Sequence, residues 1–112
     1  MHDEPKLNVS FRFLALSVDD ANQLGKLPID ASFGQHHKTG DTTAIIPLNN
    51  NAVKHILEFV KDRDIDTEET DIFMSLVTDY DTRILDVPRE VNEVINALDC
   101  RLVYSFTYVG EL

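Results

Sequence analysis

The pattern of hydrophobic and polar positions along the chain predicts about four strands. At the start of residues 7–18 every second side chain is apolar, which is the period of a strand buried on one face. Residues 101–109 show the same alternation, whereas residues 72–78 are apolar on both faces, as is typical of an interior strand. Residues 42–48 form a shorter apolar run. Because Pro47 has no N–H group, this strand either lies at a sheet edge or ends there.

Apolar positions at helical spacing predict two longer helices and one short helix. A helix over about 51–63 follows a run of asparagines that can cap it, and another begins at about Pro88, which fits a first helical turn. A short helix capped by Asp19 or Asp20 ends near Leu24. The side chains predicted to face the core are Val53, Ile56, Leu57 and Val60 in the helix over 51–63, and Val91, Val94, Ile95 and Leu98 in the helix after Pro88.

The order of these elements predicts the fold class. Strands and helices that alternate along 112 residues favour a single α+β domain, a two-layer sandwich of about four strands with two main helices and one short helix. We expect residues 1–6 to be flexible, and residues 26–41, which contain Pro and Gly, to form an irregular loop. The helix between 72–78 and 101–109 would allow these two strands to be parallel, but the pattern alone does not decide their direction.

Charge is distributed unevenly along the chain. The protein has 20 acidic and 10 basic residues, a net charge of −10. Residues 1–56 carry a net charge of −1, and residues 57–112 carry −9. Nucleic acids and anionic membranes are poor partners for such a surface, because each phosphate contact needs local positive charge. The charge favours a basic partner protein instead.

The cysteine content and the chain start bear on the cellular compartment. Cys100 is the only cysteine, so no disulfide can form within the chain, which suits a reducing cytosol. No apolar run is long enough for a transmembrane helix. The first residues are polar and acidic, unlike a secretory signal. We therefore expect a cytoplasmic protein, whose oligomeric state the sequence leaves open.

Residues 62–71 form the most acidic segment, with six acidic residues and one basic residue. Its first three aspartates have the spacing of an EF-hand calcium loop, but Thr67 replaces the required glycine and Phe73 the final glutamate, which leaves at most weak binding of a divalent cation. We expect no metal site and no cofactor. The segment is either a solvated loop that keeps the protein soluble or a docking surface for a cationic protein. The candidate partner-binding residues are Asp62, Asp64, Asp66, Glu68, Glu69, Asp71, Asp79 and Asp81.

The sequence contains no catalytic or nucleotide-binding motif of the GxSxG, GxGxxG or Walker type. The alternative function is a small enzyme or ligand-binding domain that uses residues 31–41. Its candidate residues are His36 and His37. Adjacent side chains of an extended segment point to opposite sides, so one metal ion does not readily bind both. A solvated loop is the favoured interpretation, and Cys100 is expected to be a buried apolar residue. The protein is therefore predicted not to be an enzyme.

Aromatic residues alternate along the last predicted strand, where Leu102, Tyr104, Phe106 and Tyr108 share one face. Such a row could stack the bases of single-stranded nucleic acid, or it could form a sheet face packed under a helix. Because the net charge is −10, we expect the packed face.

Four stretches of the chain carry a family resemblance. They are DDANQLGKLPI after the first strand, KTGD at 38–41, DIFMSLVTDY, and ILDVPREVNEVINALDCRLVYSFTY. Over about residues 7–109 this layout resembles a family of small bacterial proteins catalogued only as a domain of unknown function. The chain departs from the family pattern in the turn over 24–28 and lacks the tryptophan expected in the second strand. The resemblance implies a small α+β fold, and no catalytic residues, since the family has none assigned.

Small acidic α+β proteins are also similar to bacterial immunity proteins, which neutralise a toxin by covering it. Toxin nucleases tend to be basic because they bind phosphate, so an acidic inhibitor is physically sensible. The sequence therefore predicts a non-enzymatic binding protein of the immunity or antitoxin type, which covers a basic partner such as a toxin nuclease. A third hypothesis is a domain that self-associates through the strand over 42–48.

Overall fold

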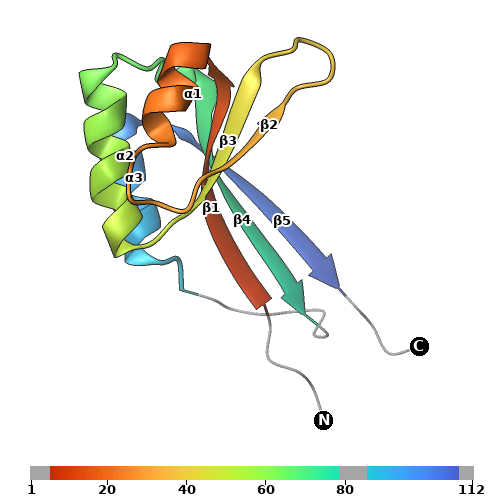
Figure 1. Ribbon diagram of the computed structural model, residues 1–112. Coiled ribbons are helices and arrows are strands. Elements are labelled where there is room, and N and C mark those ends of the chain that lie inside the picture. The colour runs from red at the N-terminus through yellow and green to blue at the C-terminus, as the bar shows by residue number, and fades with distance from the viewer. Residues whose placement is uncertain (1–5, 79–85, 109–112) are drawn as a thin grey trace.

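Five strands form one mixed sheet, and three α-helices cover one of its faces (Figure 1). The computed structural model describes residues 6–78 and 86–108. The elements are β1 (Lys6–Leu16), α1 (Val18–Leu24), β2 (Ser32–Gln35), β3 (Thr42–Pro47), α2 (Asn50–Asp62), the 3₁₀ turn η1 (Thr67–Glu69), β4 (Thr70–Thr78), α3 (Arg89–Leu98) and β5 (Arg101–Tyr108). The predicted α+β class is confirmed, with five strands in the described part of the chain rather than four.

The strand order across the sheet is β2-β3-β1-β4-β5. Neighbouring strands run antiparallel from β2 to β4, whereas β4 and β5 are parallel. Parallel neighbours cannot be joined by a tight hairpin, and α3 lies between them in the chain. The direction that the sequence left open is thus parallel, and β4 is an interior strand as predicted.

The short strand β2 was not predicted. It lies within residues 26–41, which were expected to be irregular, and it pairs with β3 along the outer side of the sheet. All four residues of β2 are exposed, so no buried alternation marks them as a strand. Because β3 has β2 on one side and β1 on the other, the strand over 42–48 is not an edge. The hypothesis of self-association through it is therefore wrong, and Pro47 marks the end of the strand instead.

The core lies between the sheet and the helices. Phe11 and Phe13 of β1 are fully buried and pack edge to face, with ring centroids 5.0 Å apart. Phe13 makes a similar contact with Phe59 of α2, at 5.6 Å. Each such burial stabilises the fold by roughly 1.5–3 kcal/mol. The predicted helix stripes are confirmed: Val53, Ile56, Val60, Val91 and Val94 are buried, and Leu57, Ile95 and Leu98 pack at the margin of the core.

The helix ends have identifiable chemical causes. The Asn49 side chain accepts a hydrogen bond of 2.9 Å from the Ala52 amide, which caps α2 as predicted. In α1 the cap is Ser17, which accepts from the Asp20 amide, so the prediction that Asp19 or Asp20 is the cap is wrong. Both aspartates lie instead in the first turn of α1, where the helix dipole favours negative charge. Their carboxylates bind Arg63 instead of capping the helix.

Candidate functional site

The acidic segment connects α2 to β4 and surrounds η1. Ile65 is partly buried against the core and anchors the segment, and its amide donates to the Val60 carbonyl at 3.0 Å. Asp64 has a left-handed backbone, with φ of 51°, and the Asp66 side chain caps η1 by accepting from the Glu68 amide. With Ile65 turned inward, the acidic side chains around it face the solvent. Asp62, Asp64, Asp66, Glu68 and Glu69 are all exposed.

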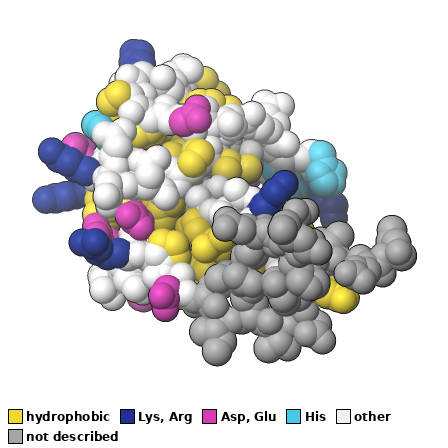
Figure 2. Space-filling view, turned by 90° about the horizontal axis from the view of Figure 1, so that it is seen from below, with side chains coloured by type: hydrophobic (Ala, Val, Ile, Leu, Met, Phe, Trp, Pro, Cys, Tyr) yellow, Lys and Arg dark blue, Asp and Glu magenta, His cyan; other side chains and the backbone are white. Residues whose placement is uncertain are grey.

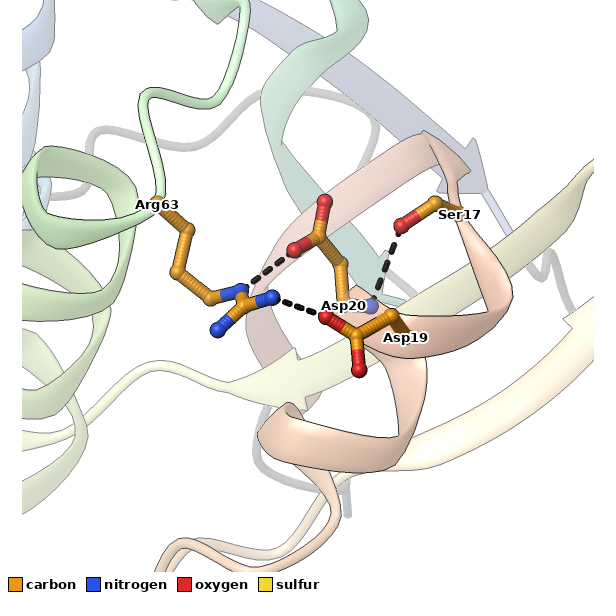
Figure 3. A network of polar contacts seen from close by, with 4 residues as sticks. All are labelled: Ser17, Asp19, Asp20 and Arg63. Atoms are coloured by element: carbon orange, nitrogen blue, oxygen red, sulfur yellow. Dashed lines mark hydrogen bonds and ion pairs between the residues drawn. The ribbon is translucent and has the colours of Figure 1, made fainter.

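The only cation of this segment is engaged elsewhere. Figure 3 shows the Arg63 guanidinium directed at α1, where it donates from Nε to Asp20 and from Nη2 to Asp19. The hydrogen bond to Asp20, more than any other contact, raises the pKa of Arg63 above its ordinary value. Within residues 6–78 and 86–108, no basic side chain forms an ion pair with the five exposed acids. Their negative charge is therefore not compensated locally.

Asp71 does not belong to this exposed group. It is 1% exposed, and its two carboxylate oxygens accept from Arg12 Nε at 2.7 Å and Arg12 Nη2 at 2.6 Å. The Arg12 guanidinium also lies 4.7 Å from the centroid of the Phe73 ring. These bonds to Asp71 raise the pKa of Arg12. The prediction that Asp71 contacts a partner is therefore wrong, because this carboxylate is buried and already paired.

The remaining predicted residues, Asp79 and Asp81, lie outside the described part of the chain. Of the eight candidate residues, five thus lie on one exposed segment, and a sixth, Asp71, is buried in the sheet.

The aromatic row of β5 is exposed rather than packed under a helix. The register places Leu102 beside Ile72 and Tyr104 beside Met74, so the row lies on the same face of the sheet as the core. The helices nevertheless leave it open, because α3 packs Val91 and Val94 into the core rather than covering the outermost strand. The prediction of a packed face is wrong. The exposed fractions are 44% for Leu102, 52% for Tyr104, 42% for Phe106 and 54% for Tyr108.

The figures show where this row lies. In Figure 1, β5 runs along the side of the sheet opposite β2 and extends beyond the helices. Figure 2, seen from below, shows hydrophobic side chains in the middle of the view, with most of the visible charged side chains on the left. Isolated exposed apolar residues are common, but four in succession on one strand form a continuous patch.

The acidic segment lies beside the beginning of β5. A shallow depression of about 410 Å³ is lined by residues of η1, of the α3–β5 turn and of β5 itself. Asp99 at this turn has a left-handed backbone, with φ of 53°, which ends α3 and directs the chain into β5. The lining residues are Thr67, Glu68, Asp99 and Arg101. The carboxylates of Glu68 and Asp99 and the guanidinium of Arg101 therefore lie at the first residue of β5. Because Arg101 pairs with Asp71, its side chain points to the sheet face opposite the apolar row.

The histidines of the alternative function lie in the turn between β2 and β3. Both His36 and His37 are exposed, and their rings are stacked with centroids 5.2 Å apart. The Lys38 amide donates to Nδ1 of His36 at 3.2 Å. Among the described residues, no three His, Cys, Asp or Glu side chains are placed to hold a metal ion. The structure therefore adds no metal-ligating group to these two histidines.

Two other groups bear on an enzymatic function. His55 lines a hollow of about 220 Å³ together with Glu58 and Asp62, so a histidine does lie near carboxylates, although not in the 31–41 loop. Cys100 is buried, and its burial raises the pKa of the thiol above its ordinary value. A raised pKa keeps the thiol protonated and therefore poorly nucleophilic at neutral pH, as expected for a packing residue.

Comparisons with protein-family models, with curated proteins and with solved structures find no significant match to this chain. The resemblance to a family of small bacterial proteins stays a prediction. No helix in residues 6–78 or 86–108 has the length and apolar character needed to cross a bilayer.

Proposed function

We propose that the protein is a non-enzymatic binding protein that covers a basic partner protein, in the manner of immunity or antitoxin proteins. The observation that carries the proposal is that a segment with five exposed carboxylates, none of them in an ion pair among the described residues, lies next to the first residue of β5, a strand with an exposed apolar row. Neither feature by itself would distinguish a contact surface from a solvated loop or a scattered surface residue. Their proximity at the beginning of β5 is what supports a binding role.

The two features supply different parts of a protein–protein interface. Apolar and aromatic side chains contribute the free energy of binding at the centre of an interface, and charged groups at its rim set orientation and association rate. Tyr and Phe suit this role because they bury a large area at a low cost in conformational entropy. A carboxylate rim favours partners that present Lys or Arg, and it repels nucleic acid.

Charge reversal at η1 tests this proposal. Glu68 and Glu69 are exposed and take part in no ion pair among the described residues, so Glu68→Lys with Glu69→Lys should leave the fold intact. The partner is captured on the immobilised protein from cells that produce it, eluted with salt and purified, and its affinity is then titrated at several salt concentrations. We expect the double variant to bind at least about tenfold more weakly and with a shallower salt dependence.

The matched control is Asp30→Lys with Asp41→Lys, which changes the net charge equally at exposed positions away from η1. The proposal predicts that this control keeps most of the affinity. An equal loss in both variants would show that only the net charge matters. An affinity that neither salt nor the η1 variant changes would rule out a role for the acidic segment.

A further inference from the structure

The two edges of the sheet differ in how they are protected. The β2 edge has only four residues, and very short edge strands are one way in which proteins prevent unwanted pairing. The β5 edge has eight residues, and among the described strands β5 pairs only with β4. Residues 102–108 contain no charge, no proline and no glycine. The outer N–H and C=O groups of β5 therefore form a long edge without the usual features that prevent strand addition.

The side chains of β5 match this open edge. The exposed row of Leu102, Tyr104, Phe106 and Tyr108 lies on the helix side, where an added strand would place every second side chain beside it. Valine, tyrosine, phenylalanine and threonine also have high strand propensity, so the edge is formed before any partner binds. A strand added here would cover apolar surface and pair backbone groups in the same step.

The charges beside β5 indicate which segment would fit. Glu68 and Asp99 line the depression at the start of β5, and the acidic segment continues beyond it. Arg101 supplies one positive charge there, which the surrounding carboxylates outnumber. An added strand that ends in lysine or arginine at this point would meet negative charge, whereas one that ends in acidic residues would be repelled.

We propose that the β5 edge binds an extended segment of the basic partner by strand addition, with apolar side chains at alternate positions and lysine or arginine at the end next to η1. The proposal rests on the proposed function, because it assumes a cationic partner. A second copy of this chain fits less well, because each copy carries a net charge of −10.

A peptide probe tests the proposal on the full-length protein. The probe is a short acetylated peptide of alternating valine and threonine with a pair of lysines at its N-terminal end, and a second peptide has the pair at its C-terminal end. Binding is followed by amide chemical shifts in NMR spectra of the isotope-labelled protein. We expect one peptide to bind at least tenfold more tightly than the other, with the largest shifts in residues 101–108. Which peptide binds shows whether the added strand is parallel or antiparallel.

Two phenylalanines on opposite edges provide a matched pair of variants. Phe106 on β5 is 42% exposed and Phe33 on β2 is 46% exposed. Phe106→Lys should weaken the tighter peptide at least tenfold by breaking the apolar row, and Phe33→Lys should change its affinity less than twofold. If Phe106→Lys does not fold, Tyr104→Lys takes its place, because that side chain is more exposed. Shift mapping on the unsubstituted protein needs neither variant.

The outcomes separate this inference from the proposed function. Absence of peptide binding, shifts away from β5, or equal affinity for both peptides would overturn strand addition, while a partner that still depends on Glu68 and Glu69 would uphold the acidic surface. Sedimentation that shows a dimer at pH 7, dissociated by Phe106→Lys, would identify a second copy as the occupant and overturn the inference as well.

Discussion

At the scale of the residue, environment decides what each acidic side chain does. Asp71 and Glu69 lie close together in the sequence, yet Asp71 is buried against Arg12 while Glu69 faces the solvent. The difference arises because Asp71 belongs to β4, where its side chain points to the face opposite the helices and meets Arg12 across the β1–β4 pair. A carboxylate that is buried and paired stabilises the fold, and an exposed one is available to a partner.

The role of Asp71 can be measured. Asp71→Asn keeps the shape of the side chain but removes its charge. The amide oxygen can accept one hydrogen bond from Arg12, and the second is lost because the NH2 group is a donor. We expect the free energy of unfolding to fall by about 1–3 kcal/mol, as measured by urea denaturation. The control Glu69→Gln, at an exposed position of the same segment, should change it by less than about 0.5 kcal/mol. A loss of partner affinity without a loss of stability in Asp71→Asn would contradict the assignment.

At the scale of the element, local chemistry sets helix boundaries and tertiary pairing sets strands. The α2 helix begins after Asn49 because that side chain satisfies an otherwise unpaired amide, a contact within four residues that sequence reasoning can foresee. The β2 strand has no such local signal, because it is held only by its pairing with β3 and all its side chains are exposed. Elements stabilised by local contacts were therefore predicted, whereas an edge strand stabilised by distant ones was not.

The cap of α2 supplies a prediction at this scale. Asn49→Ala removes the acceptor of the Ala52 amide, and we expect the protein to lose about 1 kcal/mol of stability. Asn50→Ala is the matched control, because Asn50 lies one position further along in the same asparagine run and is exposed. Thermal unfolding followed by circular dichroism at the helix band compares the two. Equal loss in both variants would argue against a specific cap.

At the scale of the whole molecule, a large negative charge coexists with an exposed apolar strand. The net charge of −10 keeps copies of the protein apart, and this repulsion opposes pairing through β5. The same charge would attract the cationic partner that we propose, so it would both protect the open edge and favour the proposed contact. In this proposal, repulsion between copies and attraction of the partner depend on the same groups.

This balance predicts a dependence on pH. As pH falls from 7 toward the isoelectric point of the sequence, about 4.6, the net negative charge and the repulsion between copies decrease. We expect the protein to be monomeric at pH 7 and to self-associate as the pH approaches the isoelectric point, as followed by light scattering. Phe106→Lys should suppress the association more than Phe33→Lys, because only the first variant alters the β5 row. Association that both variants suppress equally would point to another surface.

The fold class, the helix faces and the charge distribution of this protein follow from local sequence patterns and from composition. The α+β class, the buried stripes of α2 and α3 and the excess of acid after residue 57 follow from periodicity and from counting charges. The proximity of η1 to β5, the burial of Asp71 and the exposure of the aromatic row were decided by the tertiary structure alone. The physical reason is that alternation tells which side chains share a face, whereas burial depends on whether a distant element covers that face, and α3 packs into the core instead of over β5.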